Sequence, residues 1–333
     1  MCFFDGSTVL VTGGTGSFGH RFVERMLGET SCAKLIVLSR DEMKQWSMRQ
    51  RFKSDKRLRM FIGDVRDRER LYRALQGVDY VVHAAATKIV PVAEYDPFEC
   101  IKTNVLGAMN VIDAAIDCGV KRLVALSTDK ASSPTNLYGA SKLASDKLFI
   151  AANSYGGGEG CRFSVVRYGN VMGSRGSLIP ALLDASVNGV FSLTHPEMTR
   201  FMISLDESVD LVFQAFKEAV GGEIFVKKIP SMRVKDVIEA LRPDLEIKET
   251  GIRPGEKVHE QMIGEEDNPY TYEYPAYYKI LPSIHRWNAD AARIGDGRPV
   301  SSDFRYTSDR NKDWMSADVL RAWVERSGSQ IIR

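Results

Sequence analysis

Residues 7–19 read STVLVTGGTGSFG, and this stretch decides the fold. The apolar run Ser7–Thr12 is typical of a buried strand, and Phe18–Leu27 has the spacing of a helix. Glycine recurs at every third position between them, which lets the backbone turn tightly and approach a ligand. In a strand–turn–helix unit, this arrangement places a pyrophosphate at the positive N-terminus of the helix. The stretch therefore predicts a dinucleotide site, held by Gly13, Thr15, Gly16, Ser17, Phe18 and Gly19.

The alternation of strand and helix continues outward from this unit. Further apolar runs are typical of strands, at Lys34–Ser39, Leu58–Ile62, Tyr80–His83, Arg122–Ser127 and Arg162–Arg167. Helical spacing separates them, at Asp41–Phe52, Asp67–Leu75 and Pro97–Cys118, and we expect left-handed C-caps at Gly28, Gly77 and Gly119. Such alternation requires a parallel sheet covered on both faces. The predicted fold class is a doubly wound α/β sheet of the Rossmann type.

The composition changes after about Gly169, where glycine, proline and serine become frequent and the alternation ends. We therefore expect a Rossmann domain over residues 1–172 and a mainly substrate-binding domain over 173–333. The apolar pattern of 203–220 is expected to return to the sheet, and Gly156–Gly158 is expected to form a surface loop.

Charge and cysteine content exclude several classes of protein. Lys and Arg number 45 against 43 acidic residues, so no basic face is indicated and we expect neither nucleic-acid nor membrane binding. The five cysteines are scattered, without a Cys-x-x-Cys pair, which favours buried thiols in a reducing compartment and no metal site. The first residues, MCFFDGSTVLVTGG, do not resemble a signal peptide, and no apolar run is long enough to span a bilayer. We expect a cytoplasmic protein.

The end of the second predicted strand bears on the choice between NAD and NADP. An acidic residue there usually binds the ribose 2′-hydroxyl, whereas an arginine accommodates a 2′-phosphate. Arg40 occupies this position, so NADP is predicted, although Asp41 keeps open the alternative that Arg40 is only a surface residue. The remaining expected cofactor contacts are Ser39, Asp41, Lys44, Asp64, Val65, Ala84, Ala85, Ala86 and Val171.

Residues 126–142, LSTDKASSPTNLYGASK, contain the predicted catalytic groups. Asn136 is a plausible N-cap, which places Tyr138 and Lys142 one turn apart on the same face of a helix. An ammonium beside a phenol lowers the pKa of the phenol, so we expect Tyr138 to act as a base near neutral pH. Both residues are also expected to contact the cofactor.

The motifs TGGTGSFG, HAAA, Tyr-x-x-x-Lys and RYGNV resemble those of the extended short-chain dehydrogenase/reductase superfamily. More narrowly, SRDEMKQ, VPVAEYDPFECIKTN, STDKASSPTNLYGASK, RYGNVMGSRGS, MTRF and GIRPGEKVHE resemble the inverting UDP-N-acetylglucosamine 4,6-dehydratases over nearly the whole chain. The resemblance implies a hydro-lyase of bacterial glycan biosynthesis, on the route to pseudaminic acid, acting on a nucleotide sugar. Its product would be UDP-2-acetamido-2,6-dideoxy-β-L-arabino-hex-4-ulose. A homo-oligomer is expected.

The resemblance also implies residue roles. Tyr138 would take the proton of the sugar 4-hydroxyl, and Thr128 would hydrogen-bond the 4-oxygen. Lys130 would remove the C5 proton and Asp129 would protonate the departing 6-hydroxyl, while the group that returns a proton to C5 stays open. Implied substrate contacts are Lys88, Asn170, Arg175, Arg200 and Arg253.

The chain departs from the family at Thr87, Ile89 and Met202 and over Leu193–Pro196, which bears on the hexosamine and on the C5 outcome. Three alternative functions remain. A retaining 4,6-dehydratase or a 4-epimerase would use the same fold, and an epimerase would need only Tyr138 and the cofactor. A regulator that binds NADP(H) without turnover would have no need of Asp129 and Lys130.

Overall fold

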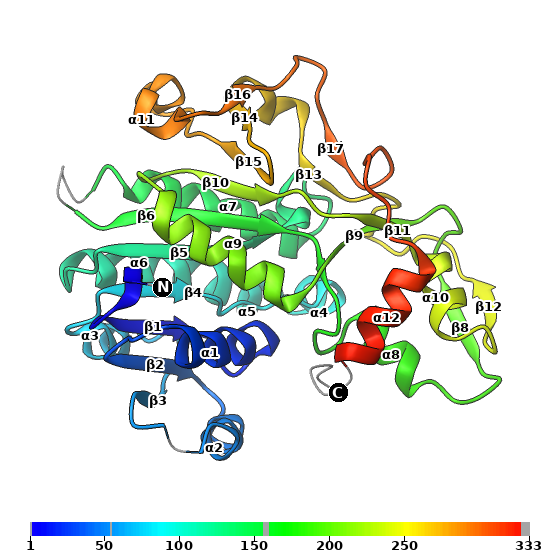
Figure 1. Ribbon diagram of the computed structural model, residues 1–333, viewed down its shortest axis with the longest axis horizontal. Helices are drawn as coiled ribbons and strands as arrows, with labels where there is room; N and C mark the ends of the chain where they lie inside the picture. The colour runs from blue at the N-terminus through cyan, green and yellow to red at the C-terminus, as the bar shows by residue number, and fades with distance from the viewer. Residues whose placement is uncertain (1, 54, 156–159, 328–333) are drawn as a thin grey trace.

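The computed structural model describes residues 2–53, 55–155 and 160–327, so the loop predicted at Gly156–Gly158 lies outside the described residues. A ten-stranded sheet forms its centre, in the order β16-β14-β15-β10-β6-β5-β4-β1-β2-β3 (Figure 1). The strands β3 to β10 of this order run parallel, and β15, β14 and β16 add an antiparallel edge. The strand bounds are β1 Thr8–Thr12, β2 Lys34–Ser39, β3 Leu58–Ile62, β4 Tyr80–His83, β5 Arg122–Thr128, β6 Arg162–Tyr168, β10 Ile224–Lys227, β14 Thr271–Glu273, β15 Tyr277–Ile280 and β16 Arg298–Pro299.

Helices cover both faces of this sheet, which confirms the doubly wound fold class. The helix α9 (Leu205–Glu218) lies in front of the sheet in Figure 1, beside α1 (Ser17–Glu29), and α7 (Leu137–Ala152) lies behind it. Ser204 and Glu207 form a capping box that starts α9, and Arg21 of α1 pairs with Asp206 at 2.6 Å. The other helices near the sheet are α2 Glu42–Arg51, α3 Arg68–Leu75, α4 Val90–Tyr95, α5 Pro97–Ile101 and α6 Gly107–Asp117.

The predicted strand positions agree with the structure to within a residue at each end, but two helix expectations were wrong. The single helix expected over Pro97–Cys118 is divided into α5, a π-helical turn at Lys102–Leu106 and α6. Asn104 in that turn donates to the carbonyl oxygen of Thr87 at 2.9 Å, a tertiary contact that periodicity does not encode. Gly28 lies inside α1 rather than at a left-handed cap, whereas Gly77 and Gly119 have φ of 68° and 72° and are confirmed as caps.

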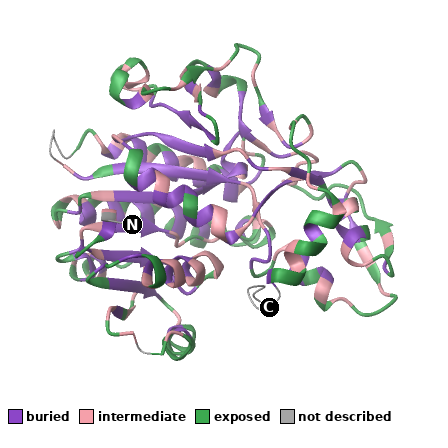
Figure 2. Cartoon of the chain, in the orientation of Figure 1, coloured by how far each residue is buried: buried purple, intermediate pink, exposed green. Residues whose placement is uncertain are grey.

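A second, smaller core lies beyond the sheet, on the right of Figures 1 and 2. Met172, Leu182, Met202 and Ile238 are buried in it together with Leu320 near the end of the chain. Its elements are β7 Asn170–Val171, α8 Leu178–Asp184, β8 Val190–Leu193, β9 Thr199–Ile203, β11 Ser231–Arg233, α10 Val234–Leu241, β12 Glu246–Glu249 and α12 Ala317–Ser327. The strands β13 Gln261–Ile263 and β17 Tyr306–Thr307 pair separately, and α11 spans Ala291–Ile294.

The C-terminal half therefore contributes more to the main sheet than α9 alone, because β10, β14, β15 and β16 belong to it. The functional division at 172/173 stays a prediction. In the part of the chain that the structure describes, no helix has both the length and the apolar character needed to cross a membrane. Within the same residues, no three His, Cys, Asp or Glu side chains are grouped so that they could hold a metal ion.

Candidate active site

The glycine-rich turn after β1 is shaped by two close approaches. Gly13 has a φ of 64°, and a Cβ atom there would lie 2.8 Å from the backbone N and Cα of Ala85. A Cβ at Gly19 would overlap the carbonyl of Gly14. Both positions therefore require glycine, and the turn keeps the open backbone that a pyrophosphate needs. Gly16 is the N-cap of α1 and makes no side-chain cap, so the first amides of the helix remain available to an anion.

The loop after β4 is fixed against this turn by one hydroxyl. Thr12 Oγ1 accepts hydrogen bonds from the backbone N of Ala84 at 3.1 Å and of Ala85 at 3.2 Å, and it contacts His83 Nδ1 at 3.0 Å. The predicted cofactor residues of the two loops thus come together, and Ala86 follows them as an exposed residue. Thr15 is buried, and Phe18 packs against the main core. The role of Thr12 was not predicted, because a threonine at the end of a mostly apolar strand gives no signal of this contact.

The carboxyl end of β2 presents a cation beside β3. The Arg40 side chain is 64% exposed, and its nearest acidic partner is Asp64, at 3.7 Å. Asp41 caps α2 by accepting from Lys44 N at 2.9 Å, and its carboxylate also pairs with Lys44 Nζ. Ser39 is buried and held by the side-chain amide of Gln45, which donates to its oxygen atoms. Asp41 and Lys44 pair with each other, so Arg40 is the side chain of this group whose positive charge is available to a ligand.

Val65 follows Asp64 beyond the end of β3 and is buried in the main core. It packs against α6, where a Cβ on Gly107 would lie 2.8 Å from Val65 Cγ2. Asp64 pairs with Arg66 at 2.6 Å, which lowers the pKa of its carboxyl against the effect of partial burial.

The predicted catalytic loop joins β5 to α7. Asn136 caps α7 by accepting from Gly139 N at 2.8 Å, as predicted. A Cβ at Gly139 would overlap the carbonyl oxygen of Lys130, so the first turn of α7 packs directly on the Thr128–Lys130 segment. This contact brings Tyr138 close to Thr128, whose hydroxyl donates to Asp129 Oδ1 at 2.9 Å.

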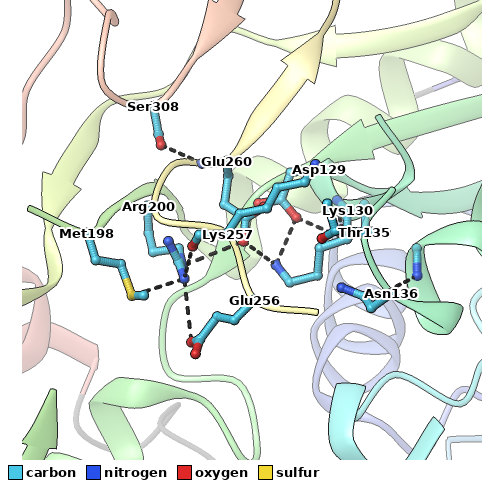
Figure 3. A network of polar contacts seen from close by, with 12 residues as sticks. Asp129, Lys130, Thr135, Asn136, Met198, Arg200, Glu256, Lys257, Glu260 and Ser308 are labelled. Atoms are coloured by element: carbon cyan, nitrogen blue, oxygen red, sulfur yellow. Dashed lines mark hydrogen bonds and ion pairs between the residues drawn. The ribbon is translucent and has the colours of Figure 1, made fainter. Parts of the chain in front are cut away.

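Lys130 is held between two carboxylates. Its Nζ lies 3.1 Å from Asp129 Oδ1 and 3.0 Å from Glu260 Oε1 (Figure 3). Burial acts to lower the pKa of Lys130, but the two carboxylates outweigh it and raise the pKa. Burial raises the pKa of Asp129, and Glu260 adds to this rise while Lys130 opposes it. Burial alone would raise the pKa of Glu260 as well, but Lys130 and Arg200 lower it.

The expected effect of Lys142 on Tyr138 was wrong. Burial raises the pKa of Tyr138 to about 12, and the groups that oppose this rise are Lys130 and the Thr128 hydroxyl. Lys142 is itself buried, which lowers its pKa, and the carboxylate that acts against this change is Asp146. Tyr138 and Lys142 do share the predicted helix face, but the charge that assists the phenol comes from Lys130.

Two of the predicted substrate residues line one pocket. Asn170 of β7 and Arg200 of β9 border a small hollow whose apolar lining includes Val171 and Met202. Asn170 Oδ1 is buried and has no hydrogen-bond partner among the described residues, so a ligand donor would satisfy it. Arg200 is different, because its guanidinium donates to the carbonyl oxygens of residues 199, 257 and 258. Its assignment to a diphosphate stays a prediction.

The remaining predicted substrate residues are scattered. Lys88 Nζ donates to the carbonyl oxygen of Arg175 at 3.2 Å, and Arg175 N donates to Ser17 Oγ at 3.0 Å. These two residues therefore lie at the N-terminus of α1, beside the expected pyrophosphate. Arg253 is exposed on the loop before β13, and no described contact joins its side chain to the other four.

Several residues of the site escaped the sequence analysis. Glu260 lies within GIRPGEKVHE, a stretch that carried the family resemblance, yet its contact with Lys130 had no local signal. The same segment covers the catalytic loop, because Lys257 Nζ donates to Ser132 O at 2.8 Å and Asn136 Nδ2 donates to Gly255 O at 2.7 Å. Asn104 is buried and donates to Ser141 Oγ at 2.9 Å.

Comparisons with known proteins agree with this architecture. The model of the family described as "Polysaccharide biosynthesis protein" matches residues 9–282. A protein of Campylobacter jejuni named UDP-N-acetylglucosamine 4,6-dehydratase (inverting) is 51% identical over 324 residues, which cover 95% of this chain and 97% of that protein. A protein of Rickettsia conorii named UDP-glucose 4-epimerase is 43% identical over 286 residues, 83% of each chain.

A solved structure covers the whole fold. The X-ray structure of Pen from Bacillus thuringiensis superposes with a TM-score of 0.89 at 34% identity, covering 99% of this chain and 100% of that one. The chain belongs to the polysaccharide biosynthesis protein family and is a relative of the inverting UDP-N-acetylglucosamine 4,6-dehydratases.

Proposed function

We propose that this chain catalyses the NADP-dependent 4,6-dehydration of UDP-N-acetylglucosamine with inversion at C5. The observation that carries the proposal is the ion pair of buried Asp129 with half-buried Lys130 next to Tyr138, in a chain 51% identical to enzymes named for this reaction. Oxidation at C4 requires only the tyrosine as a base, whereas elimination of water also requires a second base and an acid. The product would supply polysaccharide biosynthesis, as the family description suggests.

The residues of the site divide the reaction between them. Tyr138 accepts the proton of the 4-hydroxyl, and the neighbouring Thr128 contacts the same oxygen. Lys130 accepts the C5 proton once a ketone at C4 has made that hydrogen acidic. Asp129 donates a proton to the departing 6-hydroxyl, a role suited to a carboxyl whose pKa burial raises. NADP, when bound, supplies the site with a hydride acceptor at C4 and a hydride donor at C6, so none is consumed.

The choice of NADP over NAD rests on the end of β2. Arg40 is exposed there, and the carboxylate of Asp41, which would repel a 2′-phosphate, is engaged by Lys44. The proposed cofactor contacts are the glycine-rich turn, Arg40 with its neighbours Ser39, Asp41 and Lys44, the Asp64–Val65 and Ala84–Ala86 segments, Val171, Tyr138 and Lys142. The proposed substrate contacts are Lys88, Asn170, Arg175, Arg200 and Arg253.

A 4-epimerase is the second candidate, since relatives 43% identical to this chain carry that name. Epimerisation needs Tyr138 and the cofactor but no proton transfer at C5. Incubation of the purified protein with UDP-N-acetylglucosamine in heavy water separates the two by NMR. Dehydration predicts a 4-keto-6-deoxy product with deuterium at C5 and inverted configuration. A product that keeps its 6-hydroxyl and its C5 hydrogen would favour the epimerase.

A Lys130→Met variant sharpens this test. It should still form the reduced cofactor with bound substrate, because Tyr138 serves that step, although more slowly than the parent because Lys130 also assists the phenol. It should lose no water. Lys147→Met, an exposed lysine on α7, is the matched control and should behave like the parent. Dehydration by Lys130→Met at near the parental rate would contradict the assigned role of Lys130. Single-turnover rates at saturating substrate separate this effect from weakened binding.

We further propose a homo-oligomer in the cytoplasm. Large apolar side chains are exposed together on the α4–α6 segment, and Tyr95 and Phe98 are 87% and 78% exposed. Val92, Leu106 and Met109 add to the same segment. Sedimentation of the parent and of Phe98→Asp tests the oligomer, and a monomeric parent would exclude it. The described cysteines are unpaired, including buried Cys32, Cys100 and Cys161, which suits a reducing compartment.

A further inference from the structure

Glu260 is a buried carboxylate with no role in the mechanism above. It immediately precedes β13 and is 2% exposed, and its Oε1 lies 3.0 Å from Lys130 Nζ. The same oxygen lies 3.6 Å from Arg200 Nε. A carboxylate in such a place is costly unless its charge is matched, so its position opposite Lys130 requires an explanation.

The backbone holds Glu260 firmly in this place. Its N donates to Ser308 Oγ at 2.9 Å, and its carbonyl accepts from Ser308 N at 2.8 Å. Ser308 in turn contacts Thr199 Oγ1 at 2.6 Å, next to Arg200 on β9. Three separate segments of the C-terminal half thus fix one carboxylate against a lysine of the catalytic loop (Figure 3).

The two carboxylates around Lys130 have different surroundings. Asp129 has Lys130 as its ion-pair partner and accepts from the Thr128 hydroxyl at 2.9 Å, whereas Glu260 is close to both Lys130 and Arg200. The full charge of Arg200 stabilises a carboxylate more than one neutral hydroxyl does. Asp129 Oδ2 and Glu260 Oε2 are both buried without a hydrogen-bond partner among the described residues. Two adjacent buried carboxylates beside one ammonium favour a single negative charge between them. The extra cation places that charge on Glu260 and leaves a proton for Asp129.

The geometry points to Glu260 as a positioning residue for dehydration, which acts through Lys130 by holding its Nζ in place and accepting its proton. This inference rests on the proposed function. In the resting site Asp129 is a carboxylic acid, Lys130 an ammonium and Glu260 a carboxylate. Substrate bound in the site excludes water, and this desolvation disfavours the charged forms of both groups. Lys130 then passes one proton to Glu260 and, as an amine, takes the C5 proton of the 4-keto sugar.

Atoms and charges balance over this sequence. Breaking the C5–H bond leaves its electron pair in the enolate, which expels the 6-hydroxyl as water with the proton of Asp129. The site then holds a carboxylate at Asp129, an ammonium at Lys130 and a carboxylic acid at Glu260. Its net charge is unchanged. A proton moved from Glu260 to Asp129 restores these three residues. The proton that Tyr138 took from the 4-hydroxyl balances the proton that returns to C5 after hydride addition at C6, so no further reactant is needed.

Glu260→Gln tests this role while keeping the size of the side chain. We expect formation of the reduced cofactor within a few-fold of the parent, and a KM within a few-fold. The exchange of C5 hydrogen with heavy water and the release of water should both fall by about 10²-fold, as for loss of a positioned proton acceptor. Glu260→Asp keeps the charge and should recover part of the exchange rate. Glu223→Gln, which alters a fully buried carboxylate bound to Val220 N and Gly221 N, is the control for a structural loss.

The pH profile provides a readout that a purely structural role would not change. Charged and titratable groups that act on Asp129 and Glu260 are Lys130, Arg200, Lys257 and Tyr138. Glu260 helps to raise the pKa of Asp129, so its neutralisation should lower that pKa. Dehydration needs protonated Asp129. The decline of the dehydration rate at high pH should therefore begin at a lower pH in Glu260→Gln than in the parent.

Three results would overturn the role of Glu260. The first is C5 exchange by Glu260→Gln within threefold of the parent, and the second is an equal loss of cofactor reduction and of exchange. The third is an unmoved pH profile. If Glu260→Gln does not fold, the test uses Glu260→Asp. An equal fall of C5 exchange and of cofactor reduction in Glu260→Asp would exclude the role. A parent that leaves UDP-N-acetylglucosamine unchanged overturns the proposed function and this inference together, whereas the three results above leave the proposed function intact.

Discussion

The carboxylate of Asp41 accepts a hydrogen bond from Lys44 N at 2.9 Å and pairs with Lys44 Nζ at 3.2 Å. Asp41 is the acidic residue that could have bound a ribose 2′-hydroxyl, and its own helix uses it as an N-cap instead. The neighbouring Arg40 extends into solvent at the end of β2. This relationship bears on a local conflict in the sequence, where Arg40 and Asp41 indicate opposite cofactors.

Arg40→Asp should therefore weaken NADP binding more than NAD binding. Loss of one charge-assisted contact to a phosphate costs about 1.5–3 kcal/mol, or roughly a 10- to 100-fold rise in the NADP dissociation constant. Calorimetry on cofactor-free protein measures both constants. Arg68→Asp on α3, where Arg68 pairs with Asp113 at 3.6 Å, is the control and should leave both unchanged. An unaltered NADP affinity in Arg40→Asp would remove Arg40 from the site.

Tyr138→Phe should abolish most of the first step without unfolding the protein. The phenol is buried and its pKa is raised to about 12, so the proton transfer depends on Thr128 and Lys130 around it. We expect cofactor reduction by bound substrate to fall by about 10²–10⁴-fold, with little change in substrate affinity. Stopped-flow absorbance measures the rate. Tyr155→Phe, at an exposed position after α7, should retain the parental rate. Turnover of Tyr138→Phe within a few-fold of the parent would mean that another group is the base.

The parallel half of the fold was predictable because its signals are local. Each strand from β1 to β6 is a short apolar run, and the turn after β1 needs glycine for reasons of backbone geometry alone. The antiparallel edge was not predictable. The strands β14 and β16 have three and two residues, too few to establish a period, and they form only because β15 is already in the sheet.

The candidate site divides in the same way. Asp129, Lys130 and Tyr138 lie within one loop and the following helix turn, and the family resemblance of this stretch indicated them as catalytic groups. Glu260 reaches Lys130 from the other half of the chain, and no spacing rule relates the two. The raised pKa of Tyr138 could not be predicted from the sequence either, because burial is the main cause of the rise. The catalytic loop could thus be identified from consecutive residues, whereas its electrostatics depend on tertiary packing.

Two glycines should respond oppositely to replacement by alanine. Gly28 is helical, and a Cβ there has no atom within 4 Å, so Gly28→Ala should raise the free energy of unfolding by about 0.4–1 kcal/mol. A Cβ at Gly139 would overlap the carbonyl oxygen of Lys130, so Gly139→Ala should lower it by about 1–3 kcal/mol. Urea titration measures both changes.

Activity provides the second measurement for this pair. Gly139→Ala should also lower the dehydration rate, because the Lys130 segment must shift to relieve the contact. Gly28→Ala lies at the far end of α1 and should keep the parental rate. A Gly139→Ala protein with parental stability and rate would show that α7 and the catalytic loop do not pack as closely as described.

Acid should destabilise the protein through His83. The ring is 1% exposed between β1 and β5 and contacts Thr12 Oγ1, and burial, with Lys142, lowers its pKa from 6.5 to about 3. Below pH 6.5 the unfolded chain binds a proton that the folded chain does not, so stability rises with pH in this window. Between the two pKa values, the loss approaches about 1.4 kcal/mol for each unit of pH lowered.

Urea titrations at pH 7.5, 6.5 and 5.5 measure this dependence. Other groups titrate in the same range, so the informative quantity is the difference between the parent and His83→Gln. We expect His83→Gln to be less stable than the parent at pH 7.5, because the fit around Thr12 is disturbed, but to lose less stability on acidification. His285→Asn, at an exposed histidine, should keep the parental slope. If the parent and His83→Gln lost stability equally between pH 6.5 and 5.5, His83 would have to be protonated in the fold, and its neutral contact with Thr12 would be wrong.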